Sequence, residues 1–129
     1  MMTKVYLCAR YGRREEMQVL AARMRAMGLV VTARWVEGNN ADADAAQMDW
    51  DDLRAADMLF TFTERQDDPA WNPSWGRGGR HVEFGMAVER RMRIVIVGPV
   101  ENVFHNLPGL ARFSDVEAAL DYVVGLPVH

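Results

Sequence analysis

The chain has 129 residues, of which half are hydrophobic and 26% are charged. These values fit one compact domain and exclude a generally disordered chain. Fifteen basic and eighteen acidic side chains give a net charge of -3, which argues against a nucleic-acid polymer as the partner. The single cysteine excludes an internal disulfide. The first residues do not resemble a signal segment and no apolar run is long enough to cross a bilayer, so we expect neither secretion nor membrane insertion. We therefore expect one cytoplasmic domain over residues 1–129, with no membrane partner.

The first half of the chain alternates apolar runs with amphipathic segments. Residues 4–9 are rich in β-branched and aromatic side chains and predict a strand that ends at a polar turn. Helical spacing of methionine, leucine and alanine predicts a helix from Arg13 to Gly28, followed by a second strand over Leu29 to Trp35. A loop rich in Gly, Asn and Asp then leads into a helix over residues 45–56.

The second half continues the same alternation. It predicts strands over residues 57–63, 93–98 and 111–113, and a helix over 79–91 that follows a long polar loop. A capping-box pattern at Ser114 to Glu117 predicts the start of a terminal helix. Apolar strands separated by helices are typical of an α/β fold. We expect a small doubly wound, flavodoxin-like or Rossmann-like, parallel five-stranded sheet with helices on both faces.

Open parallel sheets bind ligands beyond the carboxyl ends of their strands, where the strand order reverses. The helix that starts near Gly79 contains Glu83, which we expect in its first turn, where the helix dipole favours an ionised carboxylate. The glycines on both sides of Glu83 indicate that a ligand comes close. The alternatives are a surface carboxylate that satisfies the dipole and glycines that serve helix packing.

An acidic cluster in the second helix supplies further carboxylates. Asp49 either caps the helix or points across the strand ends towards Glu83. Asp51 and Asp52 are expected on a solvated helix face, and Asp57 is expected to brace the turn into the third strand.

Three short patches, in this order and spacing, resemble the nucleoside 2-deoxyribosyltransferase family, including its relatives that hydrolyse the N-glycosidic bond of nucleoside monophosphates. They are Val5-Tyr6-Leu7-Cys8, Asp49 ahead of the Ala56-Asp57 step, and Gly79-Arg80-His81-Val82-Glu83-Phe84-Gly85. The resemblance implies an enzyme that cleaves or transfers at the N-glycosidic bond of a nucleoside or its 5'-monophosphate.

By matching position, the resemblance implies that Glu83 is the nucleophile that forms a glycosyl-enzyme intermediate, that Asp49 assists at the base or sugar, and that the hydroxyl of Tyr6 orients Glu83. It also implies a homodimer or a dimer-based oligomer, in which the segment from Asn102 to Asn106 reaches into the neighbouring site.

One position departs from the family pattern. The transferases acting on free nucleosides tend to carry an aspartate six residues before the nucleophile, where this chain has Arg77. An arginine there favours a phosphate, and therefore a monophosphate substrate. The expected substrate-binding residues are Arg10, Arg13, Arg77, Gly79, Arg80, His81 and Asn102. Arg10 and Arg13 have an alternative interpretation as ion-pair partners of Glu15, Glu16 and their neighbours.

Two other functions compete with this one. A non-catalytic nucleotide-binding module of the same fold is the first, and a metal site built from His81, His105, Glu83 and Asp49 is the second. No HxH or HxxxH pairing supports the metal site, so we expect neither metal nor cofactor. Trp71 and Trp75 are interpreted either as a lid over a base or as anchors of their loop, Phe104 is open to the same two interpretations, and Cys8 is interpreted as core packing.

Overall fold

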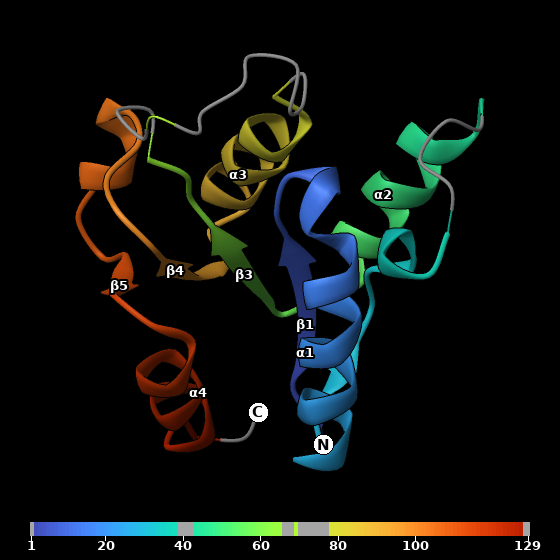
Figure 1. The fold of residues 1–129 in the computed structure, drawn as a ribbon, viewed down its shortest axis with the longest axis horizontal. Helices are drawn as coiled ribbons and strands as arrows, with labels where there is room; N and C mark the ends of the chain where they lie inside the picture. Colours follow the sequence, from blue (N-terminus) through green and yellow to red (C-terminus); the bar gives the residue numbers. More distant parts are fainter. Residues whose placement is uncertain (1, 39–42, 66–68, 70–77, 128–129) are drawn as a thin grey trace.

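A computed structural model describes residues 2–38, 43–65, 69 and 78–127, which fold around one five-stranded parallel sheet (Figure 1). The strands are β1 (Lys4–Cys8), β2 (Val30–Val31), β3 (Met58–Phe62), β4 (Arg93–Val97) and β5 (Ala111–Phe113). Their order across the sheet is β2-β1-β3-β4-β5. The predicted small doubly wound α/β fold is therefore confirmed.

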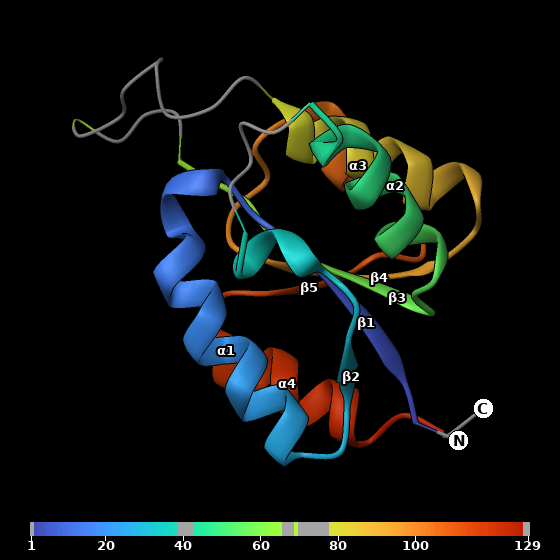
Figure 2. The same ribbon diagram turned by 90° about the vertical axis from the view of Figure 1, so that its right-hand side faces the viewer.

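Helices cover both faces of the sheet. They are α1 (Arg14–Ala26), α2 (Ala45–Arg54), α3 (Gly79–Glu89) and α4 (Val116–Val124). Figure 2 shows α1 and α4 on one face and α2 and α3 on the other. The sequence basis of this layering is plain in β3, whose five residues are all buried, as a strand covered on both faces requires.

The helix ends follow local side-chain chemistry. Asp115 caps α4, because its carboxylate accepts a hydrogen bond from the backbone N of Ala118 at 2.8 Å. The cap is therefore one residue later than the Ser114 of the predicted capping box. Gly78 precedes α3 with φ of 86°, a left-handed conformation that glycine adopts without a steric penalty.

The second strand is much shorter than predicted. The expected strand ran from Leu29 to Trp35, but β2 contains two residues, and Arg34–Val36 forms a 3-10 turn. Two contacts draw this segment away from the sheet edge. The backbone N of Arg34 donates to Asp52 at 2.9 Å, and the indole N of Trp35 donates to the carbonyl of Leu7 at 2.8 Å. These tertiary contacts outweigh the β propensity of the segment.

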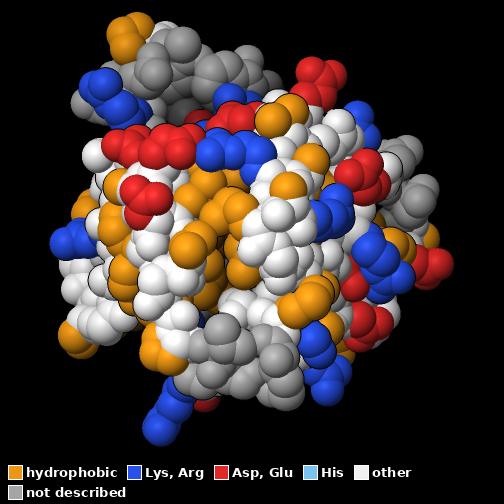
Figure 3. Space-filling view, turned by 90° about the horizontal axis from the view of Figure 1, so that it is seen from below, with side chains coloured by type: hydrophobic (Ala, Val, Ile, Leu, Met, Phe, Trp, Pro, Cys, Tyr) orange, Lys and Arg blue, Asp and Glu red, His pale blue; other side chains and the backbone are white. Residues whose placement is uncertain are grey.

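The two ends of the sheet differ in character. Seen from below Figure 1, at the amino end of β1, hydrophobic side chains gather in a hollow that charged side chains border (Figure 3). The opposite end holds the carboxyl ends of the strands. There the strand order reverses at β1, because β2 lies on one side of β1 and β3 lies on the other. This is the edge at which the ligand site is predicted. Among the described residues, no helix is long and apolar enough to cross a membrane.

Candidate active site

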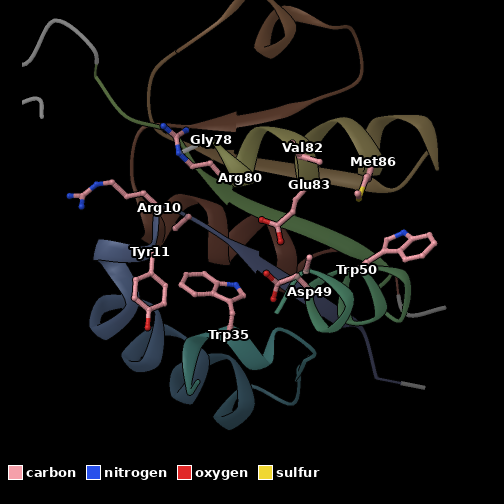
Figure 4. Close-up of a pocket in the computed structure, with 13 residues that line it drawn as sticks. Arg10, Tyr11, Trp35, Asp49, Trp50, Gly78, Arg80, Val82, Glu83 and Met86 are labelled. Atoms are coloured by element: carbon pink, nitrogen blue, oxygen red, sulfur yellow. The ribbon is translucent and has the colours of Figure 1, made fainter. Parts of the chain in front are cut away.

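A cavity of about 310 Å³ lies where the chain leaves β1 and enters α3 (Figure 4). Its walls come from three parts of the chain: the turn after β1, the middle of α2, and the first two turns of α3, with Trp35 beside them. The lining residues are Ala9, Arg10, Tyr11, Trp35, Ala46, Asp49, Trp50, Gly78, Gly79, Arg80, Val82, Glu83 and Met86. The cavity therefore lies at the predicted carboxyl edge of the sheet.

A wider hollow of about 510 Å³ lies at the other edge of the sheet, near Arg91, Arg93 and Tyr122. Among the described residues that line it, the one carboxylate is Asp57, which accepts a hydrogen bond from the backbone N of Lys4 at 3.0 Å. Asp57 thus braces the start of β3, as predicted. Of these two cavities, the one at the carboxyl edge has two carboxylates facing one space, so it is the candidate active site.

Glu83 points into this cavity, and two side chains of β1 hold it. The hydroxyl of Tyr6 donates to Oε2 of Glu83, and the thiol of Cys8 lies 3.6 Å from Oε1. Tyr6 and Cys8 are two residues apart on a strand, so they point to the same face. Cys8 was expected to serve only as core packing, but the structure places its sulfur against the carboxylate, so that expectation is incomplete.

The environment of Glu83 differs from the predicted one. Glu83 is the fifth residue of α3, and no acidic residue lies in the first turn. The dipole effect falls off within that turn, so burial acts more strongly and raises the pKa of Glu83 to about 7. Hydrogen bonds from Tyr6 and Cys8 oppose this rise, and the charge of Asp49 adds to it.

The glycines around Glu83 do not serve helix packing. A Cβ placed on Gly79 or Gly85 would meet no described atom within 4 Å, and both residues are exposed. Gly79 lines the cavity at the start of α3. Of the two interpretations of these glycines, the structure therefore disfavours packing against the sheet.

Asp49 lies opposite Glu83. It sits in the middle of α2, which begins at Ala45, so the N-cap interpretation is wrong. Figure 4 shows the carboxylates of Asp49 and Glu83 directed towards one another. Burial, and then the charge of Asp52, raise the pKa of Asp49 to about 6.

Asp51 and Asp52 have different environments. Asp51 is exposed, as predicted, and accepts a hydrogen bond from Gln47 at 3.0 Å. Asp52, predicted on the solvated face, is only 7% exposed. Its carboxylate accepts a hydrogen bond from the backbone N of Arg34 at 2.9 Å and forms an ion pair with the guanidinium of Arg34 at 2.9 Å. Asp52 was misassigned because its partner lies in a turn that was predicted as strand.

Aromatic side chains form one wall of the cavity. Trp35 is 8% exposed, and the rings of Tyr11 and Trp35 are 6.3 Å apart. Trp50 is 44% exposed at the rim, with the guanidinium of Arg54 4.8 Å from its ring. Flat apolar surface beside two carboxylates suits a ligand with a planar ring next to a reactive polar centre.

Arg10 and Arg13 converge on one carboxylate. Glu64, at the end of β3, pairs with Arg10 at 3.0 Å and with Arg13 at 2.8 Å. Arg13 also pairs with Glu16 at 2.8 Å and lies over the ring of Phe62. Arg10 lines the cavity, whereas Arg13 does not. For Arg13, the ion-pair alternative is the one that the structure favours.

Arg80 lines the cavity but is paired with a buried carboxylate. Its guanidinium makes two hydrogen bonds to Glu101, at 2.5 and 2.6 Å, and the side chain of Glu101 is 1% exposed. The backbone N of Glu64 also donates to Glu101, at 2.9 Å. Burial alone would raise the pKa of Glu101, but these hydrogen bonds and the charge of Arg80 lower it to about 2.

His81 and Asn102 belong to the same polar cluster and lie outside the cavity lining. Nε2 of His81 is 3.4 Å from Glu101, and Nδ1 of His81 is 3.4 Å from the amide of Asn102. Nδ1 of the buried His105 accepts hydrogen bonds from the backbone N of Glu101 and of Asn102. Burial, more than any other cause, lowers the pKa of both histidines. Across residues 2–38, 43–65, 69 and 78–127, no group of three or more His, Cys, Asp and Glu side chains is arranged to hold a metal ion.

The structure thus brings Arg10, Gly79, Arg80, Asp49 and Glu83 to one cavity, with Tyr6 behind Glu83. It does not bring Arg13, His81 or Asn102 to the lining. Arg77, Trp71 and Trp75 lie outside the described residues.

Sequence reasoning missed several residues of this region, including Tyr11, Trp35 and Trp50 in the cavity lining, and also Cys8 and Glu101. Cys8 carried a usable signal, because a strand side chain two positions after Tyr6 shares its face. Glu101 carried none, because its partners Glu64 and Arg80 are 37 and 21 positions away along the chain.

Comparison with known proteins supports the fold. No family model matches the sequence, and no curated protein sequence matches it. Among solved structures, a CMP N-glycosidase from Clostridium botulinum, BcmB, superposes with a TM-score of 0.61 at 16% identity. The match covers 94% of this chain and 98% of that one. At the level of the fold, this confirms the resemblance indicated by the three sequence patches.

Proposed function

We propose that this protein cleaves the N-glycosidic bond of a nucleoside or its 5'-monophosphate, ribosyl or deoxyribosyl, through a glycosyl-enzyme intermediate on Glu83. The observation that carries the proposal is the pair of facing carboxylates, Glu83 and Asp49, at the carboxyl edge of the sheet. The fold shared with a CMP N-glycosidase over nearly the whole chain supports the same reaction class.

In the first step, an ionised oxygen of Glu83 attacks the anomeric carbon, and the bond from that carbon to the base nitrogen breaks. The base leaves with the electron pair and takes a proton from Asp49, whose raised pKa of about 6 keeps a protonated fraction near neutral pH. The product is an ester between the sugar and Glu83. The hydrogen bond from Tyr6 orients the attacking group.

In the second step, an acceptor attacks the anomeric carbon and releases the carboxylate of Glu83. Water gives hydrolysis, and a second base gives transfer. Asp49, now ionised, takes the proton of the acceptor. The rings of Tyr11 and Trp35, with Trp50 at the rim, offer apolar surface for the base.

A substrate panel tests this proposal. The protein is incubated with ribonucleosides, deoxyribonucleosides and their 5'-monophosphates, with and without a second free base, and released base is measured by chromatography. We expect base release that Glu83→Gln abolishes and that Glu89→Gln, at the exposed end of α3, leaves unchanged. Binding of a nucleotide without any base release would favour the non-catalytic module instead.

The same panel addresses the phosphate. Arg77→Ala should raise KM for a nucleotide more than for the matching nucleoside, because a charge-assisted hydrogen bond to phosphate is lost. Equal effects on both substrates would exclude a phosphate contact for Arg77.

A further inference from the structure

The two oxygens of Glu83 have different hydrogen-bond donors. Tyr6 donates to Oε2, and Cys8 lies against Oε1 with a sulfur-to-oxygen distance of 3.6 Å. Both donors come from β1 and are fully buried. The resemblance accounts for Tyr6, whereas nothing so far assigns a role to the thiol.

A third polar group lies behind the thiol. Cys8 and Thr61 are paired in the register of β1 and β3, so their side chains lie side by side on one face of the sheet, and Thr61 partly offsets the rise in the pKa of the thiol. Thr61 is only 4% exposed. A buried hydroxyl on β3 is therefore the strand neighbour of the thiol that contacts Oε1 of Glu83.

The thiol has one proton and two acceptors within reach. Besides Glu83, the carbonyl oxygen of Arg80 lies 3.5 Å from the sulfur. A thiol donates more strongly to a carboxylate than to a neutral carbonyl. It therefore donates to Glu83 while that group is ionised, and it can turn to Arg80 when the carboxylate becomes protonated or esterified.

We propose that Cys8 is a positioning residue for Glu83, and that its thiol fixes the second carboxylate oxygen, Oε1. The consequence for catalysis rests on the proposed function. The thiol stays protonated throughout, because burial and the nearby charge of Glu83 raise its pKa. No proton leaves Cys8 at any step, and its effect on the reaction acts through Glu83.

Among the described residues, five groups face Glu83 or line its cavity with a charge or with a hydrogen bond to its carboxylate. Tyr6 and Cys8 face it from β1, and Asp49 faces it from α2. Arg80 precedes it on α3, and Arg10 lines the same cavity. Removal of the thiol alone leaves the other four groups in place, so a change in the titration of Glu83 reports the loss of that donor.

The first measurement is the titration of Glu83 in the free protein, followed by NMR of side-chain carboxyl carbons labelled in glutamate. Glu83→Gln assigns the signal by removing it. We expect Cys8→Ala to raise the pKa of Glu83 by about half a unit, the scale of a weak thiol hydrogen bond. Cys8→Ser, which keeps a donor, should restore a value near that of the wild type.

Two further variants separate the contact between the thiol and Glu83 from general packing. Thr61→Val should change the pKa of Glu83 less than Cys8→Ala does, because Thr61 is the strand neighbour of the thiol and this variant keeps the thiol. Thr63→Val is the matched control on the same strand. The hydroxyl of Thr63 donates to the carbonyl of Pro99 at 2.6 Å, so this substitution should leave the titration of Glu83 unchanged.

The second measurement is kinetic. If Cys8 orients Glu83, Cys8→Ala should lower kcat severalfold with KM unchanged, and Cys8→Ser should recover most of the loss. Titrations of Glu83 that coincide in the wild type and in Cys8→Ala would overturn the proposal. A wild type that releases no base would contradict the proposed function alone, because the NMR titration still decides whether Cys8 donates to Glu83.

Discussion

The proton affinity of Glu83 depends on a balance between burial and hydrogen bonding. Burial disfavours the charged carboxylate, whereas the donors Tyr6 and Cys8 stabilise it. The pKa of Asp49 is likewise raised by burial, and then by the charge of Asp52. The two facing carboxylates therefore titrate close together, near pH 6 and 7, and the apparent values belong to the pair.

A bell-shaped pH dependence of kcat/KM follows. The first step needs Glu83 ionised and Asp49 protonated, so the pair must hold one proton. As the pH increases, activity should rise when the first proton leaves the pair and fall when the second leaves. We expect a maximum between about pH 6 and 7, set by the pKa values of about 6 and about 7. A kcat/KM that stays flat from pH 5 to 8 would contradict the paired roles.

The role of Asp49 as a proton donor predicts a partial loss of activity when it is replaced. Asp49→Asn removes proton transfer to the leaving base but keeps the shape of the side chain, so kcat should fall by about a hundredfold or more. Asp51→Asn is the matched control, because Asp51 lies two positions away on α2 and is exposed. Steady-state kinetics on the best substrate of the panel measures both. Equal rates for Asp49→Asn and the wild type would remove Asp49 from the chemistry.

At the scale of elements, Glu101 connects three segments that meet at the site. Its carboxylate binds the start of α3 through Arg80 and the end of β3 through the backbone N of Glu64. Its own backbone N donates to His105 at 3.0 Å. A buried charge of this kind stabilises the fold only while its partner is present.

Removal of that charge should destabilise the protein. Glu101→Gln leaves the guanidinium of Arg80, which is 10% exposed, without its charged partner, so the free energy of unfolding should fall by about 3 kcal/mol. Urea denaturation measures this difference. The pKa of Glu101 is lowered to about 2, so the difference should be full above about pH 5 and shrink as the pH falls towards 2.

The control for this prediction is Glu117→Gln. Glu117 pairs with Arg23 between α4 and α1 at 2.8 Å, but both side chains are largely exposed. Solvent screens such a pair, so its loss should change stability little. Similar losses in the two variants would contradict the special role of the buried pair.

The sequence predicted the elements whose signal is local and missed the contacts that are not. β3, β5 and the extent of α3 follow from apolar runs and helical spacing, and the structure has them within one or two residues. The prediction of the second strand was wrong because Arg34 and Trp35 turn inwards to partners 18 and 28 positions away. For the same reason, Asp52 and Glu101 could not be placed from local pattern.

The candidate site shows the same division. Glu83 and Asp49 were recognised because short motifs carry them, and their convergence follows from the general position of sites in parallel sheets. The raised pKa of Glu83 could not be foreseen, because it depends on burial by β1 and α2 rather than on its place in α3.

At the scale of the whole molecule, one surface carries apolar side chains that the chain leaves uncovered. Val103 is 74% exposed, Phe104 is 61% exposed and Leu107 is 38% exposed. They follow β4 and lie next to Asn102, whose amide contacts His81 near the start of α3. Exposed apolar side chains grouped in this way are typical of a protein interface.

We propose that this surface forms a homodimer or a dimer-based oligomer, as the family resemblance implies. Sedimentation velocity at micromolar concentration should show a dimer or a larger assembly. Phe104→Glu should shift it towards monomer, and it should lower activity if the segment from Asn102 to Asn106 enters the neighbouring site, as the family resemblance implies. Val19→Glu, on α1 with 65% exposure, should change neither. A wild type that is monomeric and fully active would contradict this assembly.

The most direct test of the whole account is the capture of the glycosyl-enzyme. The protein is mixed with CMP, deoxyCMP or the best substrate of the panel, quenched in acid during turnover, digested and analysed by mass spectrometry. We expect the peptide that contains Glu83 to gain the mass of the sugar, with its phosphate where the substrate carries one, as base is released. Glu83→Gln should give neither adduct nor base. Base release at the wild-type rate by Glu83→Gln would contradict the account, because Glu83 could not then be the nucleophile.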